Sequence, residues 1–462
     1  MNIELKILPK WAALLAGLLL LGYFSRSLGI LVCAGVAIYA LGGPKQSVQA
    51  LTILAFLIMT QKLDISIGRW LILFAAFGRT LLDSAFARLS TPQVLRPLLI
   101  FIGVMLITSF FYSIFPTVSI LKIVTFSMGT TTVLIGLHRT RHLKEYWFSW
   151  IYTFALFIIF ASLPMYFLPG GFDRNGVGFQ GITSHPQTLG PILAPLVAFL
   201  SGLYLFHPSE RRNKLVGIAA LIGWIEMYTA LSRTSMFAAL LAFIIIIILA
   251  YTVKTEEWGL KVQRALALPE VVGAGLLVFI LLGLQWSSFQ EQITQFIYKD
   301  DNAGSVTEIL RGSRGYLIDQ SMMNFHENPV VGIGFGVPSD PGPFGSRIET
   351  GPFGLPVGAS VEKGFMPSAV LEETGIIGAA LIIILLASFI KQILRHGNII
   401  AFWMFGAGLL VNLGEMIFFS MGGNGLYLWI IFGFCYTWST IIHEEQTEVE
   451  DSQVAEEEVA TV

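Results

Sequence analysis

Residues 234–253 read TSMFAALLAFIIIIILAYTV, an apolar run without one charged side chain. A helix of this length is about 30 Å long, which matches the hydrocarbon thickness of a bilayer. The composition of the whole chain agrees, because 55% of its 462 residues are hydrophobic and only 13% are charged. Soluble domains carry roughly 25% charged residues. The sequence therefore predicts an all-α fold, a polytopic bundle of transmembrane helices.

Similar apolar runs recur along the chain. They lie at 9–23, 28–43, 48–61, 65–78, 97–116, 119–137, 147–168, 187–206, 214–231, 234–253, 270–286, 366–393, 398–420 and 424–441. We therefore expect about fourteen spans, or twelve if the short second to fourth runs include an interfacial or re-entrant pair.

The runs divide the chain into four regions. Residues 1–286 form a transmembrane bundle with spans 1 to 11, and residues 366–441 add spans 12 to 14. Between them, 287–365 is the one long polar interruption and is expected to hold short helices. Residues 442–462 are strongly acidic and lack aromatic side chains, which predicts a disordered tail.

The orientation follows from lysine and arginine, which accumulate in cytoplasmic loops. With the N-terminus placed inside, most of the 28 basic residues fall in cytoplasmic segments. Short outside loops then hold only Arg26, Lys62, Arg174 and Arg233. We therefore predict that both termini are cytoplasmic and that the 287–365 region is extracytoplasmic.

Ionisable residues inside the spans gather in the predicted outer half. They are Arg69, Lys122, Glu226, Glu372, Glu373 and Glu415. A charge at mid-bilayer costs roughly 3 kcal/mol or more, and such residues are functional by default. Long side chains can instead snorkel towards the headgroups, but carboxylates have short stems. The pattern favours a polar cavity near the outer surface.

Arginines in the polar interruption suggest an anion site. Arg311 and Arg314 lie three residues apart, so they share one face of a helix and can grip one anion, phosphate above all. The simpler alternative is a solvated loop in which these arginines pair with Asp300, Asp301 or Glu308.

Two further outside segments carry polar groups. The glycine-rich stretch 170–187 offers Arg174 and His185, and for His185 structural and functional roles are both open. In the tight turn 231–235, Arg233 precedes an apolar run, where a helix N-terminus would reinforce an anion site.

Other chemistry has little support. Cys33 and Cys435 lie in apolar runs far apart, which indicates buried thiols and no disulfide or metal site. The Gly-Ile-Gly of 332–334 lacks the strand–helix context of a dinucleotide site. A structural role is favoured for His326, which follows an apolar helical face and precedes a proline turn. We expect no metal, no cofactor and no nucleic-acid partner.

Four short motifs carry a family resemblance. Ser232-Arg233-Thr234 opens a span, and Arg314 precedes Pro329-Val-Val-Gly332-Ile-Gly334 by fifteen residues. Glu373-Thr-Gly375-Ile-Ile-Gly378 follows the polar region. The fourth motif, Gly181-Ile-Thr-Ser-His185-Pro186, comes before the other three in the sequence. In this order the motifs resemble the O-antigen ligase and O-antigen polymerase superfamily of bacterial envelope glycan assembly, over residues 170 to 400.

The resemblance implies a membrane glycosyltransferase of the bacterial plasma membrane. Such enzymes move a glycan from a polyprenyl diphosphate to a sugar hydroxyl on the outer face. The partners would be this lipid-linked glycan, a glycan or lipid acceptor, and membrane lipids. Because the diphosphate leaving group needs charge stabilisation, we expect Arg233, Arg314, Arg311 and Arg174 to bind it.

One position departs from the family. Ligases usually carry a His-Asn pair about nine residues before the glutamate of Glu-x-Gly, and here Gly364 and Phe365 stand there. The general base must then be another residue. Candidates, in order, are Glu362, Lys363, His185 and His326.

Two other functions stay open besides the choice between ligase and polymerase. A transporter or flippase of lipid-linked sugars would place charges at mid-bilayer in halves related by an internal repeat, and we detect no such repeat. A non-catalytic assembly protein of envelope polysaccharides is suggested by the missing histidine.

Overall fold

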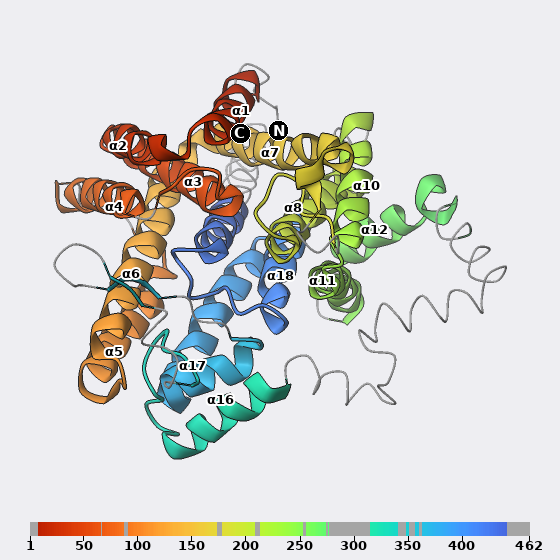
Figure 1. The fold of residues 1–462 in the computed structure, drawn as a ribbon. Helices are drawn as coiled ribbons and strands as arrows, with labels where there is room; N and C mark the ends of the chain where they lie inside the picture. Colours follow the sequence, from red (N-terminus) through yellow and green to blue (C-terminus); the bar gives the residue numbers. More distant parts are fainter. Residues whose placement is uncertain are drawn as a thin grey trace, which may run out of the picture.

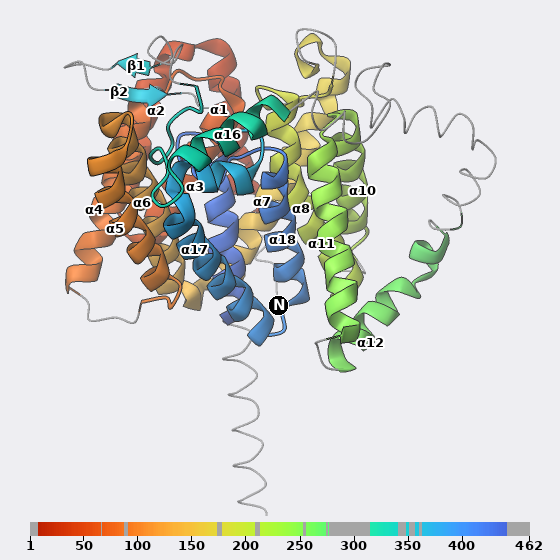
Figure 2. The ribbon, with the colours of Figure 1, turned by 90° about the horizontal axis from the view of Figure 1, so that it is seen from below.

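The structure, a computed structural model, describes residues 8–65, 67–86, 91–172, 178–207, 213–252, 256–273, 276, 315–340, 348–350, 356–359 and 363–440. It is a bundle of α-helices, most of which run side by side (Figures 1 and 2). The predicted all-α polytopic bundle is therefore confirmed. Within the described ranges, two short antiparallel strands, β1 (Ile348–Thr350) and β2 (Pro356–Ala359), are added in the polar region.

Six of the described helices are long and apolar enough to cross a membrane. They are α5 (Leu95–Tyr112), α6 (Pro116–Arg139), α8 (Pro186–Phe206), α11 (Arg233–Thr252), α17 (Met366–Arg395) and the continuous stretch Arg141–Phe167, which contains α7 (Lys144–Ser162) between the 3-10 turns η2 (Arg141–Leu143) and η3 (Leu163–Phe167). These helices support the prediction of a membrane protein.

The remaining helices are shorter or less apolar. They are α1 (Leu8–Phe24), α2 (Gly29–Ala40), α3 (Pro44–Thr60), α4 (Gly68–Phe86), α10 (Lys214–Thr229), α12 (Glu256–Leu266), α16 (Tyr316–Glu327), α18 (Ile399–Leu410) and residues 424–440. Each predicted apolar run overlaps a helix, and the run 270–286 is described only in part.

One predicted span ends early. The apolar run 398–420 forms α18 only to Leu410, and the chain then turns through 411–423 before the last helix begins. The Asn412 side chain explains the break, because its amide donates to the carbonyl oxygens of Gly408 and Leu409 at 3.1 and 3.2 Å. Its oxygen accepts the N–H groups of Ile417 and Phe418 at 3.0 and 2.9 Å.

The connections between helices collect at two ends of the bundle, because successive helices alternate in direction (Figure 2). At one end, the Ser184 N–H donates to the Met59 carbonyl, and the Ile114 N–H donates to the Ile333 carbonyl. Helix α16 lies across this end, which we call the α16 end (Figure 2). It gathers the connections that the charge pattern predicts to be extracytoplasmic.

Other described connections lie at the opposite end, where α12 is found (Figure 2). There the Trp258 indole donates to the Gly397 carbonyl at 3.0 Å, and Lys45 lies 3.6 Å above the Tyr146 ring. The two groups of described connections thus lie at opposite ends of the bundle, and which end faces the cytoplasm stays a prediction.

The core surrounds α3, α8 and residues 424–440, whose side chains are buried along most of their length. Cys33 and Cys435 are buried thiols without a disulfide, as predicted. The polar region is anchored to this core by Phe335, which is fully buried with its ring 4.6 Å from that of Phe419 and 5.5 Å from that of Phe126.

Candidate functional site at the α16 end

The longest described helix, α17, is broken at Gly375. This residue has φ 62° and ψ −169°, a conformation that side chains with a Cβ strongly disfavour. The chain on either side of Gly375 is helical. A break inside an apolar helix exposes backbone groups that lipid cannot satisfy, so other parts of the protein must bond to them.

Segment 329–334 supplies those bonds. An unbroken helix would join the Ile376 N–H to the Glu372 carbonyl and the Ile377 N–H to the Glu373 carbonyl. Instead, the Ile376 N–H donates to the Pro329 carbonyl at 2.9 Å, and the Ile377 N–H donates to the Val330 carbonyl at 3.3 Å. The Glu372 and Glu373 carbonyls accept the N–H groups of Ile333 and Gly334, at 2.8 and 3.2 Å.

Glycine is required on both sides of this contact. Gly332 has φ 73°, and a Cβ there would lie 2.5 Å from the carbonyl carbon of Glu373. A Cβ on Gly375 would collide with the backbone of Val330. The motifs 329–334 and 373–378, which the sequence presents as separate, therefore form one docked unit.

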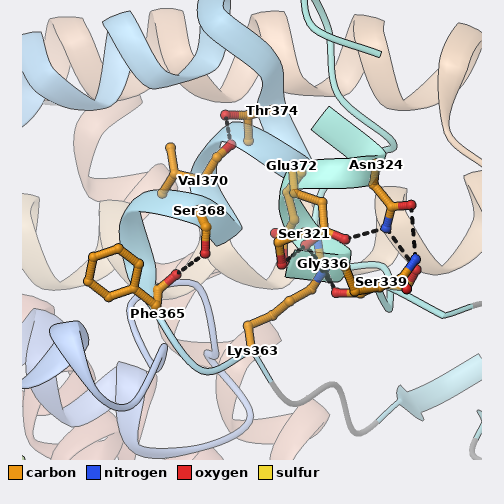
Figure 3. A network of polar contacts seen from close by, with 12 residues as sticks. Ser321, Asn324, Gly336, Ser339, Lys363, Phe365, Ser368, Val370, Glu372 and Thr374 are labelled. Atoms are coloured by element: carbon orange, nitrogen blue, oxygen red, sulfur yellow. Dashed lines mark hydrogen bonds and ion pairs between the residues drawn. The ribbon is translucent and has the colours of Figure 1, made fainter. Parts of the chain in front are cut away.

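A buried charge network fastens α16 to the same unit (Figure 3). The Glu372 carboxylate is fully buried and accepts from Lys363 Nζ at 2.5 Å, Ser321 Oγ at 2.7 Å and Ser339 Oγ at 3.1 Å. Its other oxygen accepts from Asn324 Nδ2 at 2.6 Å. Two residues of α16, one of the following segment and one preceding α17 thus meet at a single carboxylate.

A second, adjoining contact ties α6 to α17. The Glu373 carboxylate accepts the Gly336 N–H at 2.7 Å, while Lys122 Nζ donates to the Gly336 carbonyl at 2.5 Å. Lys122, Lys363, Glu372 and Glu373 together carry balanced formal charge, which is how proteins tolerate ionised groups in an apolar interior. The sequence predicts that Lys122, Glu372 and Glu373 line a cavity, whereas in the structure they bond to the chain itself.

Glu226 is separate from this network. It lies on α10, fully buried, and within the described part of the chain neither carboxyl oxygen has a hydrogen-bond partner. It therefore differs from Glu372, which is equally buried but accepts four hydrogen bonds.

Arg233 begins α11 at the α16 end. Its turn is packed tightly on both sides, because Ser232 lies against Gly190 of α8 and Thr234 lies against Gly414. The Ser232 hydroxyl donates to Ser235 Oγ at 2.8 Å. The turn is thus held between α8 and the segment after α18.

The segment 411–418 joins the Arg233 turn to the charge network. Gly414 packs against Thr234, and two residues further on the Met416 N–H donates to the Lys363 carbonyl at 3.2 Å. Arg69, at the start of α4, lies against Gly422 of the same connection. Arg69, Lys363 and the Arg233 turn therefore all contact one connection, residues 411–423, at the α16 end.

No family model matches the chain, and no curated protein is significantly similar to it. Function is therefore inferred from the residues themselves.

The candidate bases have different surroundings. Lys363 is buried and its ammonium donates to Glu372 and Ser339. His185 caps α8, since its Nδ1 accepts the Gln187 N–H at 3.1 Å. His326 is exposed on α16, with Nδ1 2.6 Å from the Met322 carbonyl oxygen. Arg174, Arg311, Arg314 and Glu362 lie outside the described residues.

Sequence reasoning missed three polar residues of the network, Ser321, Asn324 and Ser339. One local signal was present, because Ser321 and Asn324 are three apart and share a face of α16. The prediction for this helix used its apolar residues instead, and the carboxylate that Ser321 and Asn324 contact lies about fifty residues further along the chain.

Proposed function

We propose that the chain is a membrane glycosyltransferase. It moves a glycan from a polyprenyl diphosphate carrier to a sugar hydroxyl on the outer face of the bacterial plasma membrane, as O-antigen ligases and polysaccharide polymerases do. The main support is the contact between 329–334 and 373–378. Both motifs belong to the resemblance to O-antigen ligases and polymerases. In the structure they form one hydrogen-bonded unit, in which Gly332 and Gly375 are needed because a Cβ at either would collide with the other segment.

The expected leaving group is a diphosphate, which needs positive charge more than it needs a proton. Arg233 lies in the first turn of α11, where backbone N–H groups add to the field of the guanidinium. Arg311 and Arg314 come directly before α16, the helix that crosses the same end of the bundle. These arginines are the proposed diphosphate ligands, with Arg174 as a fourth.

The acceptor hydroxyl needs a general base with an available lone pair. Lys363 donates with its ammonium, and His185 Nδ1 already accepts a backbone N–H. Glu362, which precedes Lys363 in the sequence, is therefore the proposed base, and the exposed His326 is the alternative. No residue of this mechanism needs a cofactor.

The proposal is tested by Arg233→Ala in a deletion strain of the source organism. At matched protein level, we expect loss of surface glycan and accumulation of carrier-linked glycan. Arg264→Ala, an exposed arginine of α12 at the opposite end, is the matched control and should behave as wild type. Unchanged surface glycan in Arg233→Ala would refute the proposal.

The broken helix α17 favours one alternative, a transporter of lipid-linked sugars, because such proteins often bind substrate at discontinuous helices. The location of the accumulated carrier-linked glycan separates the two. A transferase leaves it on the outer face, where glycosidase added to spheroplasts digests it, and a transporter leaves it protected inside. Accumulation of single-repeat glycans would identify a polymerase, and of long chains a ligase.

A further inference from the structure

We propose that Lys363 is a positioning residue. Its ion pair with Glu372 fixes the backbone at 363, and through the segment 411–418 it sets the position of the Arg233 turn. For its activity readout the inference rests on the proposed glycan transfer, but its structural readout does not.

The surroundings of Lys363 leave its ammonium no part in chemistry. The side chain is 3% exposed, and the Glu372 side chain is 0% exposed. Nζ donates to Glu372 Oε2 at 2.5 Å and to Ser339 Oγ at 3.0 Å. A general base must reach the substrate and accept a proton from it, whereas this group is enclosed and donating.

The backbone of Lys363 carries the effect outwards. Its carbonyl accepts the Met416 N–H at 3.2 Å, so the 411–418 segment is bonded to the same residue that the ion pair holds. Asn412 makes this segment a compact turn by accepting two of its N–H groups. A displacement at 363 therefore moves the turn as a unit.

This turn packs against the segment that contains Arg233. Gly414 lies so close to Thr234 that a Cβ there would collide with its side chain. Thr234 follows Arg233 directly, and Ser232 is pressed against Gly190 of α8 on the other side. With α8 fixed, movement of 411–418 changes where the guanidinium of Arg233 points.

The experiment compares Lys363→Met, Glu372→Gln and the double variant in the full chain. Either single change leaves one buried group without its partner, and the double change removes both charges at nearly constant volume. Hydrogen exchange of the detergent-purified protein reports the structure. We expect faster exchange of peptides covering 411–418 and 231–236 in each single variant, and near wild-type exchange in the double variant.

Glycan transfer in cells is the second readout. We expect each single variant to lose about tenfold or more of surface glycan, because small displacements of binding groups have large effects on rate. The double variant should regain most of it. Ser339→Ala, a milder change that removes one contact of Nζ, should accelerate exchange partially. Lys261→Met, from an exposed ion pair on α12, is the control without effect.

Three results would overturn the inference. Exchange at 411–418 that is unchanged in both single variants and in Ser339→Ala removes the positioning role. A double variant with wild-type exchange but no transfer assigns chemistry to Lys363. Transfer lost in Lys363→Met with unchanged exchange does the same. If the deletion strain shows no glycan defect, the proposed function fails, and hydrogen exchange still decides the positioning role.

Discussion

Two lysine–glutamate pairs in this protein have the same separation of charge and opposite surroundings. Lys261 Nζ lies 2.5 Å from Glu257 Oε1 on α12, and Lys363 Nζ lies 2.5 Å from Glu372 Oε2 at the α16 end. The first pair is 42% and 62% exposed, one turn apart on a single helix. The second is 3% and 0% exposed and joins separate segments.

The distance between the charged atoms alone does not determine how much an ion pair stabilises the protein. Water and salt screen the exposed pair, and its partners keep good solvation when it breaks. The buried pair has no such alternative, so removing one partner leaves an uncompensated charge in an apolar interior. The buried pair therefore holds α16, segment 331–340 and α17 together, while the exposed pair contributes little.

The largest expected effect is that of Lys363→Met. We expect the free energy of unfolding to fall by about 3–5 kcal/mol, because Glu372 then keeps its burial without its cation. Unfolding of the purified protein in detergent micelles measures it, and Lys363→Met with Glu372→Gln should recover most of the loss. A loss no greater than that of Lys261→Met would remove the distinction between the two pairs.

Gly375→Ala should be the next most damaging. Backbone strain at φ 62° costs about 1–3 kcal/mol, and the added methyl also collides with Val330, which loosens the unit that encloses the buried pair. Gly103→Ala in α5, where nothing lies within 4 Å of the new methyl, should be neutral or stabilising by about 1 kcal/mol. Equal unfolding midpoints for the two variants would contradict the docked helix break.

A third substitution extends the comparison to buried carboxylates. Glu226 has no hydrogen-bond partner among the described residues, so Glu226→Leu should leave the unfolding free energy unchanged or raise it by about 1 kcal/mol. Glu372→Leu should lower it, because four donors lose their acceptor. The same detergent unfolding assay measures both variants. A loss of unfolding free energy in Glu226→Leu as large as that in Glu372→Leu would contradict the difference between the two carboxylates.

The smallest effect is expected at the exposed pair itself. Lys261→Met should change the unfolding free energy by no more than about 0.5 kcal/mol, and the change should shrink further as salt is added. Unfolding measured at low and high ionic strength checks this. A larger loss would mean that α12 is held in place by the pair and not by Trp258, which is buried and bonded to Gly397.

Much of the fold could be predicted because lipid imposes a simple rule on the sequence. Apolar runs such as 187–206 and 234–253 have no stable alternative to a helix, and their positions were predicted well. The break at Gly375 could not be predicted in this way. Glycine occurs in many intact helices here, and the carbonyls that replace the lost bonds come from 329 and 330.

The candidate site was predicted in part. The sequence identifies Lys122, Glu372 and Glu373 as candidate site residues because they are charges inside apolar runs, and the structure brings them together. Their partners could not be found from local pattern, because Ser321 and Asn324 are ordinary polar residues until α16 is folded against α17. Long-range pairing of this kind depends on tertiary structure and leaves no periodic signal.

The most direct measurement is glycan transfer by the purified protein in nanodiscs, with a polyprenyl diphosphate-linked glycan as donor and its acceptor glycan supplied. We expect the wild type and Arg264→Ala to release polyprenyl diphosphate at the same rate. Arg233→Ala should be slower by about 100-fold, the effect of removing one well-placed donor to a developing negative charge. A wild type that releases no polyprenyl diphosphate, or an Arg233→Ala variant as fast as the wild type, would contradict a transferase site at the α16 end.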